Sequence, residues 1–341
     1  MPDGTIIGGW RILIVSDAWF PQVNGVVRTL ATVAGELRAM GHTVDVIGPD
    51  RFRTLPCPTY PDIRLALRPS RRLAEMIAAF RPDALHIATE GPLGLAARRW
   101  ARRSGARFTT AFHTRFAEYL RARTGMPLRP SYAWLRRFHR AAAATMVATD
   151  SLRAELAGRG FGGLVAWSRG VDTSLFHPQP GTDFGLPHPV FLYVGRVAVE
   201  KNIGAFLDLD LPGSKLVVGD GPQLARLARR YPAARFAGRL EGAALAAAYA
   251  GADVFVFPSR TDTFGLVLLE ALACGTPVAA FPVTGPRDVL GAAPVGVLDW
   301  DLRAAALRAL TIDRAACRAF AEGFSWRASA ETFLARLVLT R

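Results

Sequence analysis

The chain has 341 residues, 50% of them hydrophobic, so it can bury a large core and is expected to form two domains. Its three cysteines form no CxxC pair and are odd in number, which argues against a disulfide framework or a structural zinc site and fits a reducing cytoplasm. The net charge of +14 is uneven, because residues 1–180 hold 25 basic and 13 acidic residues, whereas residues 181–341 hold 17 and 15.

Neither a leader nor a membrane-spanning segment is expected. The N-terminal residues contain only a short apolar run and no basic leader, unlike a signal peptide. The longest uncharged stretch, residues 271–286, contains three prolines and is shorter than a spanning helix requires. These features predict a cytoplasmic protein.

Buried strands and amphipathic helices alternate from the start of the chain. The sequence predicts a strand over residues 11–16, a helix over 26–40 and a second strand over 43–47. This strand-helix-strand unit implies a parallel sheet with right-handed crossovers. Further strands of the first domain are predicted at residues 84–87, 108–111 and 145–148.

A proline-rich segment separates this domain from a second one of the same type. Four prolines interrupt all periodicity near residues 171–189, which is typical of a linker. Strands are then predicted at residues 190–194, 215–218, 254–257 and 278–281. The expected fold is α/β with two Rossmann-like, doubly wound domains facing a central cleft, where ligands bind beyond the carboxyl ends of the strands. The predicted boundaries are 1–170, 171–189 and 190–324, with a C-terminal helix at 325–341 that packs back toward the first domain.

The segment 259–278, SRTDTFGLVLLEALACGTPV, combines two carboxylates with a helix start. Phe264 and Gly265 immediately precede residues with helical periodicity, so the backbone amides there favour an anion. Asp262 can reach the same ligand, and Glu270 can accept hydrogen bonds from vicinal hydroxyls. Together they suggest a nucleotide sugar. The alternative is that Asp262 only caps the helix and Glu270 is a solvated helix residue.

Cations and glycines follow the other predicted strands. Arg196 and Lys201, after the strand at 190–194, could converge on a diphosphate. Gly219 and Gly221 form a tight turn after the strand at 215–218 that lets the backbone approach a ligand, although an ordinary turn explains them equally well. Gly25 follows Asn24 before a helix N-terminus and could supply amides, with an ordinary Asn-Gly turn as the alternative.

The basic first half contains arginines interleaved with apolar side chains. Residues 68–81 and 120–140 mix Arg with Leu, Met, Trp, Tyr and Phe, as in segments that lie on an anionic bilayer. Solvated arginine-rich helices are the alternative. Nucleic-acid binding would also account for the charge, but no recognised nucleic-acid module is present, so no nucleic-acid partner is expected.

Taken together, these motifs resemble a retaining glycosyltransferase of family 4, the group 1 type, with the GT-B fold. The resemblance spans the chain through FPQVNGVVRT, HTRF, GVDTSLFHP, GRVAVEKN, GDGP and the segment 259–278. SRTDTFG with HTRF resembles the branch that glycosylates membrane lipids, which includes sulfoquinovosyl-, glucosyl- and glucuronosyl-diacylglycerol synthases and related mannosyltransferases. One departure is Asp262, where the family usually has Glu, and it leaves the donor sugar open.

The resemblance implies a role for each candidate residue. Arg196 and Lys201 would hold the donor diphosphate and stabilise the leaving nucleoside diphosphate, which a metal does in other transferases. Asp262 and His113 would lie at the donor sugar; without the resemblance, a lone His at a strand end is more simply structural. The other implied donor-binding positions are Gly25, Gly219, Gly221, Phe264, Gly265 and Glu270. The expected membrane or acceptor surface comprises Arg115, Arg129, Trp134, Arg136, Arg137 and Arg140.

No metal or other cofactor is then required. The Asp208-Leu-Asp210 triplet imitates the metal-binding DxD of other glycosyltransferases, but it precedes a Pro-Gly turn in the second domain, so no metal is expected there. No general-base carboxylate or nucleophile can be identified from the sequence. The resemblance implies front-face attack, in which the departing phosphate helps to remove the acceptor proton.

The predicted function is the retaining transfer of a hexosyl or hexuronosyl group from a nucleotide sugar to a membrane lipid, with a UDP-sugar and diacylglycerol favoured. The protein would bind the inner face of the cell membrane peripherally. The alternatives are a GDP-mannose-dependent mannosyltransferase and a lipopolysaccharide glycosyltransferase. The alternatives from other functional classes are a sugar-nucleotide epimerase and a non-catalytic membrane-surface binder. The oligomeric state is left open.

Overall fold

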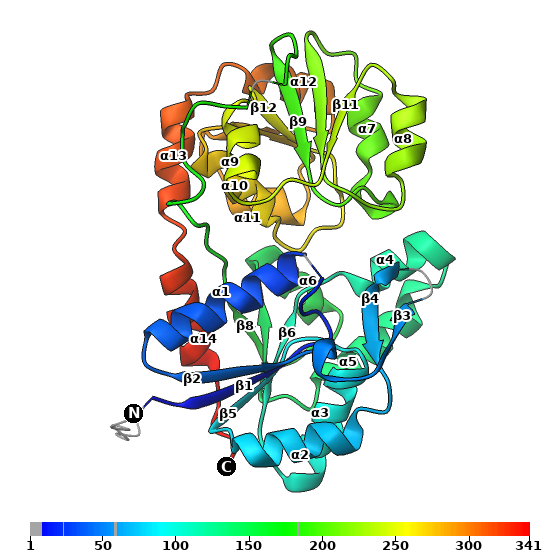
Figure 1. Ribbon diagram of the computed structural model, residues 1–341, viewed down its shortest axis with the longest axis vertical. Coiled ribbons are helices and arrows are strands. Elements are labelled where there is room, and N and C mark those ends of the chain that lie inside the picture. Colours follow the sequence, from blue (N-terminus) through cyan, green and yellow to red (C-terminus); the bar gives the residue numbers. More distant parts are fainter. Residues whose placement is uncertain (1–8, 23, 58–59, 183) are drawn as a thin grey trace. The chain divides into compact units, whose positions relative to one another are not determined.

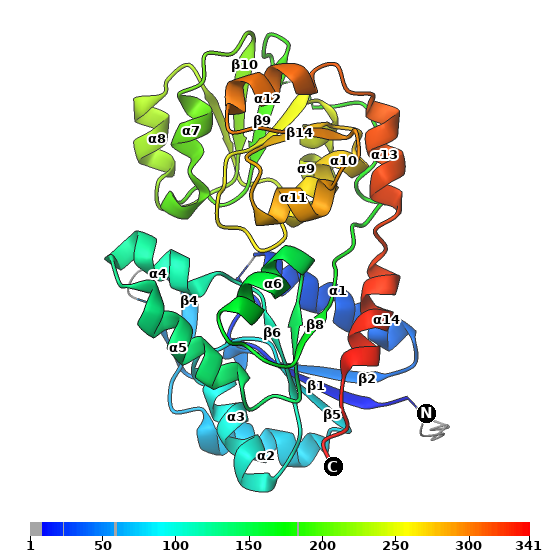
Figure 2. The same cartoon turned by 180° about the vertical axis from the view of Figure 1, so that it is seen from behind.

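The computed structural model describes residues 9–22, 24–57, 60–182 and 184–341 (Figures 1 and 2). It divides into two compact units. The first unit holds the described residues up to Ala117, together with 126–169 and 326–341, and the second holds 118–125 and 170–325. Residues 171–189, predicted as a linker, therefore group with the second unit, and the C-terminal segment groups with the first.

A six-stranded sheet forms the centre of the first unit, in the order β2-β1-β5-β6-β7-β8 with all neighbours parallel. A separate antiparallel hairpin, which the sequence did not reveal, lies between β2 and β5 in the chain. The strands are β1 (Arg11–Val15), β2 (Thr43–Ile47), β3 (Thr54–Cys57), β4 (Tyr60–Ala66), β5 (Ala84–Ile87), β6 (Thr109–Phe112), β7 (Ala144–Val147) and β8 (Leu164–Ala166). The sheet thus continues beyond β7, the last strand predicted for this domain, because β8 adds one short, partly exposed edge strand.

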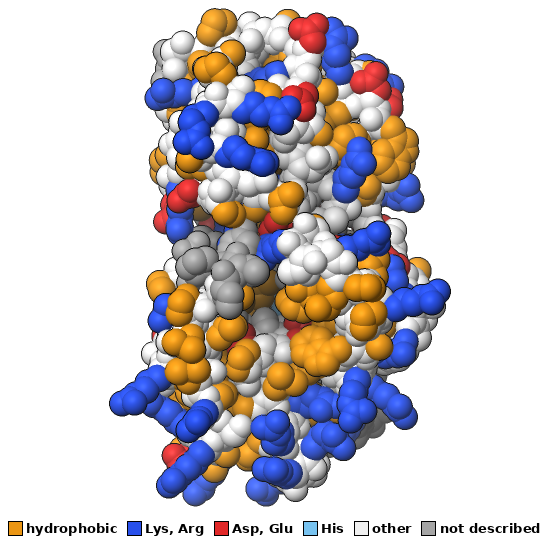
Figure 3. Space-filling model, turned by 90° about the vertical axis from the view of Figure 1, so that its right-hand side faces the viewer, with side chains coloured by type: hydrophobic (Ala, Val, Ile, Leu, Met, Phe, Trp, Pro, Cys, Tyr) orange, Lys and Arg blue, Asp and Glu red, His pale blue; other side chains and the backbone are white. Residues whose placement is uncertain are grey.

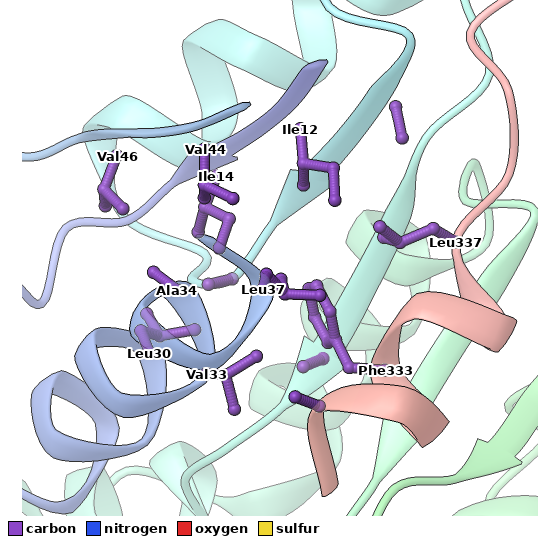
Figure 4. Packing of buried hydrophobic residues seen from close by; sticks show 14 of the residues in the cluster. Ile12, Ile14, Leu30, Val33, Ala34, Leu37, Val44, Val46, Phe333 and Leu337 are labelled. Atoms are coloured by element: carbon purple, nitrogen blue, oxygen red, sulfur yellow. The ribbon is translucent and has the colours of Figure 1, made fainter. Parts of the chain in front are cut away.

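Helices cover both faces of this sheet. They are α1 (Gly25–Ala39), η1 (Pro49–Arg51), α2 (Ser70–Phe80), α3 (Pro92–Ser104), α5 (Leu128–His139), α6 (Asp150–Gly158) and α14 (Trp326–Arg336). Another helix, α4 (Phe116–Thr124), begins in this unit, but its residues from Glu118 onward group with the second unit. Figure 4 shows Val33 and Leu37 of α1 packed with Ile12 of β1 and with Phe333 of α14. Each of these side chains is fully buried, which contributes roughly 1.5–3 kcal/mol per residue. Apolar burial thus joins the C-terminal helix to the N-terminal strands.

The second unit repeats the architecture, with the parallel order β11-β10-β9-β12-β13-β14. Its strands are β9 (Val190–Val194), β10 (Ser214–Val218), β11 (Arg235–Gly238), β12 (Val254–Phe257), β13 (Val278–Ala280) and β14 (Gly296–Leu298). Its helices are η2 (Val199–Lys201), α7 (Ile203–Leu207), α8 (Leu224–Arg230), α9 (Gly242–Ala250), α10 (Leu266–Ala273), α11 (Thr284–Leu290), α12 (Leu302–Ala309) and α13 (Arg314–Glu322). The predicted pair of Rossmann-like, doubly wound units is confirmed.

In each sheet the order of strands along the chain reverses once. The reversal lies between β1 and β5 in the first unit and between β9 and β12 in the second. Connections leave such a position in opposite directions, so the loops at the carboxyl ends of the two strands separate and leave room for a ligand. The fold therefore indicates one ligand-binding position in each unit.

Among the described residues, none of the helices has both the length and the hydropathy needed to cross a bilayer.

Candidate functional site

At the strand-order reversal of the second unit, a lysine and an aspartate form an ion pair. Lys201 ends η2, which follows β9, and Asp262 lies in the loop after β12; their Nζ and Oδ1 atoms are 2.5 Å apart. The two side chains are 18% and 14% exposed. Burial acts to lower the pKa of Lys201, but the Asp262 carboxylate outweighs it and holds the pKa above its ordinary value. Lys201 is therefore a cation at neutral pH.

Hydrogen bonds join the loops that carry this pair. Asn202 Nδ2 donates to Pro258 O at 3.1 Å, and Thr261 Oγ1 donates to Glu200 O at 3.2 Å. In the described part of the chain, the buried Asp262 Oδ2 has no hydrogen-bond partner. A buried carboxylate oxygen without a donor is costly, so a ligand hydroxyl at this position would be stabilising.

The glycines after β9 and β10 let two neighbouring loops pack closely. A Cβ added to Gly219 would lie 1.9 Å from Gly195 O, and one added to Gly221 would lie 2.5 Å from Val197 O. Both glycines also have positive φ, +139° and +155°. The close contact between the two loops explains why glycines occupy these positions. It also places the GDGP turn beside the segment that contains Arg196.

The helix that starts after Phe264 and Gly265 is α10, as predicted. Gly265 has φ +89°, a left-handed conformation that favours glycine, and no side chain caps the helix. Glu270 is only 2% exposed, and Tyr249 donates a hydrogen bond to its Oε2 at 3.0 Å. The alternative interpretation of this segment is wrong on both counts, because Asp262 does not cap α10 and Glu270 is not solvated.

His113 follows β6 at the carboxyl edge of the first sheet. Its Nδ1 lies 3.4 Å from a guanidinium nitrogen of Arg169, and its ring packs edge-on against Trp167. Burial first, and then the nearby Arg169 charge, hold the pKa of His113 well below its usual range. The imidazole is therefore neutral. Sequence reasoning missed Arg169, because it lies 56 positions away in an irregular segment.

Gly25 is the exposed first residue of α1. The preceding Asn24 caps this helix, since its Oδ1 accepts hydrogen bonds from Val26 N at 3.0 Å and Val27 N at 3.1 Å. The amides expected to meet an anion here are therefore already partly occupied by Asn24.

Most of the predicted surface residues are exposed and lie in α5 or, for Arg140, directly after it, but Arg115 does not. Arg115 is 7% exposed and pairs with Glu155 at 2.7 Å, so its expected place on a membrane or acceptor surface is corrected to a buried ion pair. Trp134 is 40% exposed. Figure 3 shows hydrophobic side chains lying among basic ones on one face of the protein. The exposed arginines of this segment are Arg129, Arg136, Arg137 and Arg140.

No cluster of three or more His, Cys, Asp or Glu side chains suited to a metal ion occurs among the described residues. Asp208 and Asp210 instead have protein partners. Tyr231 donates to Asp208 Oδ1 at 2.5 Å, and Arg303 lies 3.9 Å from Asp210 Oδ2.

Two family profiles match the chain along most of its length. Glycosyltransferase Family 4 matches residues 23–175, and Glycosyl transferases group 1 matches residues 188–312. A GDP-mannose-dependent alpha-mannosyltransferase of Mycolicibacterium smegmatis is 34% identical over 319 residues, which cover 84% of each chain. The chain belongs to glycosyltransferase family 4. It is a hexosyltransferase with the GT-B fold.

Two further likenesses bear on this glycosyltransferase. An alpha-monoglucosyldiacylglycerol synthase of Streptococcus pneumoniae is 27% identical, with 88% of this chain and 78% of the relative covered. In structure, the sucrose-phosphate synthase of Thermosynechococcus elongatus matches with a TM-score of 0.75 at 22% identity, covering 95% of this chain and 97% of that one. This structural likeness confirms the GT-B fold and leaves the substrates to be inferred.

Proposed function

We propose that this glycosyltransferase transfers an α-mannosyl group from GDP-mannose to a hydroxyl of a membrane lipid. The observation that supports this donor is the 34% identity to a GDP-mannose-dependent alpha-mannosyltransferase, with 84% of each chain covered. The UDP-sugar favoured from the sequence has weaker support, since the alpha-monoglucosyldiacylglycerol synthase of Streptococcus pneumoniae is 27% identical. A GDP-mannose-dependent mannosyltransferase therefore replaces a UDP-sugar-dependent transferase as the preferred function.

The Lys201–Asp262 pair suits the donor half of this reaction. Lys201 and Arg196 would bind the diphosphate, and the free Oδ2 of Asp262 would accept a hydrogen bond from a sugar hydroxyl. As the anomeric C–O bond breaks, its electron pair stays with the departing GDP, and Lys201 stabilises that charge. The acceptor oxygen bonds to the anomeric carbon, and its proton passes to the departing phosphate. Since GDP-mannose is α-linked, an α product corresponds to retention.

The lipid half of the proposal is supported by the exposed face of α5 and by the name of the diacylglycerol-linked relative. Arginines flank Trp134, and Phe116 and Met126, in or just after the neighbouring α4, are each 44% exposed. Basic side chains around apolar ones are suited to an anionic bilayer surface. The protein would then act while bound peripherally to the inner face of the membrane.

A product assay tests this function. Purified protein is incubated with GDP-mannose, UDP-glucose or UDP-glucuronate and with vesicles containing diacylglycerol, phosphatidylinositol or a glycosyl diacylglycerol. Mass spectrometry then identifies the products. A mannosyl lipid formed from GDP-mannose supports the proposal. A glucosyl or glucuronosyl lipid without any mannosyl product would contradict it and favour the diacylglycerol synthase function.

Chelation of metal ions is expected to leave turnover largely unchanged. Lys201 and Arg196 supply the positive charge that a divalent metal supplies in other transferases, so EDTA removes nothing that the reaction needs. The measurement is initial rate with and without EDTA, followed by addition of Mg²⁺ or Mn²⁺. Full loss of activity that either metal restores would overturn this expectation.

A further inference from the structure

The strand-order reversal of the first unit also carries a polar site. Asp17 follows β1, and Glu90 follows β5, the two strands between which the order reverses. The two loops pack tightly, because a Cβ added to Gly91 would lie 2.5 Å from the Asp17 carboxylate. Ligands of open α/β sheets bind at this position, so each side chain there is a candidate for ligand contact.

Both carboxylate oxygens of Asp17 accept hydrogen bonds from the protein itself. Its Oδ1 accepts a hydrogen bond from Leu93 N at 2.8 Å, and its Oδ2 accepts from Gly94 N at 3.2 Å and Thr89 Oγ1 at 2.9 Å. The side chain thus binds the N-terminal amides of α3. Asp17 positions the loop that contains Glu90 and fills the anion-binding end of the helix.

Glu90 is held differently, through a chain of buried side chains. Its Oε1 lies 3.1 Å from His139 Nε2, and His139 Nδ1 lies 2.9 Å from Thr110 Oγ1. Thr110 Oγ1 is in turn 3.0 Å from Thr145 Oγ1. His139 is 3% exposed and both threonines are buried, whereas the Glu90 side chain is 18% exposed. The buried chain fixes one carboxylate oxygen and leaves part of the group accessible.

We infer that Glu90 binds a hydroxyl group of the acceptor and thereby orients the acceptor for transfer. This inference depends on the proposed function in one respect, because it takes the nucleophile to be a hydroxyl group, as in the proposed lipid acceptor. A carboxylate accepts a strong hydrogen bond from a sugar or glycerol hydroxyl. It repels a phosphate. A phosphate is therefore disfavoured next to Glu90, and an uncharged hydroxyl is favoured.

The test compares Glu90→Gln with the parent protein, with GDP-mannose as donor and with dioctanoylglycerol or octyl α-mannoside, assayed separately, as the hydroxyl acceptor. Gln keeps the shape and the carbonyl oxygen that faces His139 but loses the negative charge. We expect the acceptor kcat/KM to fall roughly 10- to 100-fold, since hydrogen bonds to charged groups are the strong ones. The Kd for GDP-mannose, measured by calorimetry without acceptor, should stay unchanged.

Glu75→Gln is the matched control, because it makes the same charge change on the exposed surface of α2. Glu90→Asp, which shortens the side chain by one methylene, should also lower the acceptor kcat/KM. Unchanged acceptor kinetics in Glu90→Gln would overturn the inference, and so would an equal loss of donor affinity. If the parent uses UDP-glucose and not GDP-mannose, the proposed function fails. The acceptor kcat/KM of Glu90→Gln and of the parent, both measured with UDP-glucose as donor, then decides the role of Glu90.

Discussion

Replacing Lys201 with Ala is expected to lower kcat/KM by on the order of 10²-fold or more. The ammonium group lies 2.5 Å from Asp262 at the strand-order reversal of the second unit, where it would stabilise charge on the departing GDP. This stabilisation increases as the glycosidic bond breaks, so its loss lowers kcat and not only donor affinity. Steady-state kinetics with GDP-mannose measures the effect.

Lys215→Ala is the control, since Lys215 is the other lysine of the chain and its Nζ donates to Leu207 O at 2.7 Å, outside the site. Loss of Lys201 also leaves Asp262 without its cation, so stability must be followed separately. A Lys201→Ala/Asp262→Asn double variant removes that unpaired charge, and its thermal unfolding should resemble that of the parent more closely. If folded Lys201→Ala turns over as fast as Lys215→Ala, Lys201 has no role in leaving-group stabilisation.

Replacing Arg129, Arg136, Arg137 and Arg140 together with Gln is expected to weaken binding to anionic vesicles by orders of magnitude at low salt. Each cation near such a surface contributes about 1 kcal/mol, and four exposed arginines therefore contribute roughly 10³-fold. The contribution should shrink as salt shortens the Debye length. Vesicle flotation at two salt concentrations measures both effects.

A second quadruple variant controls for the change in net charge. Four exposed arginines of the second unit are replaced with Gln in the same way: Arg226, Arg229, Arg230 and Arg235. These residues lie on or near α8 and should contribute little to vesicle binding. If the α5 variant floats as well as the parent at both salts, its arginines form a solvated helix face, and the lipid acceptor loses its support from this surface.

Local patterns were sufficient to predict the fold and the order of the donor motifs. Short segments rich in apolar residues predicted the strands over 43–47, 84–87, 190–194 and 254–257 with the bounds the structure has. Apolar residues after Gly265 placed the start of α10 correctly. These predictions succeed because periodicity, glycine conformation and helix starts depend on residues a few positions apart. Short edge strands such as β8 and the β3–β4 hairpin lack a strong local pattern and were missed.

Tertiary structure decided which of these side chains meet. Lys201 and Asp262 are 61 positions apart, and Glu90 and His139 are 49 apart, so their contacts depend on strand order and on how the loops pack. The same long-range packing explains why Arg115 pairs with Glu155, 40 positions away, although it was predicted on the surface. The sequence by itself determined the two doubly wound units and the positions of the candidate donor motifs after the strands, because local spacing encodes them. Only the tertiary structure decided the position of Glu90 at the first strand-order reversal and the burial of Glu270, because both follow from long-range packing.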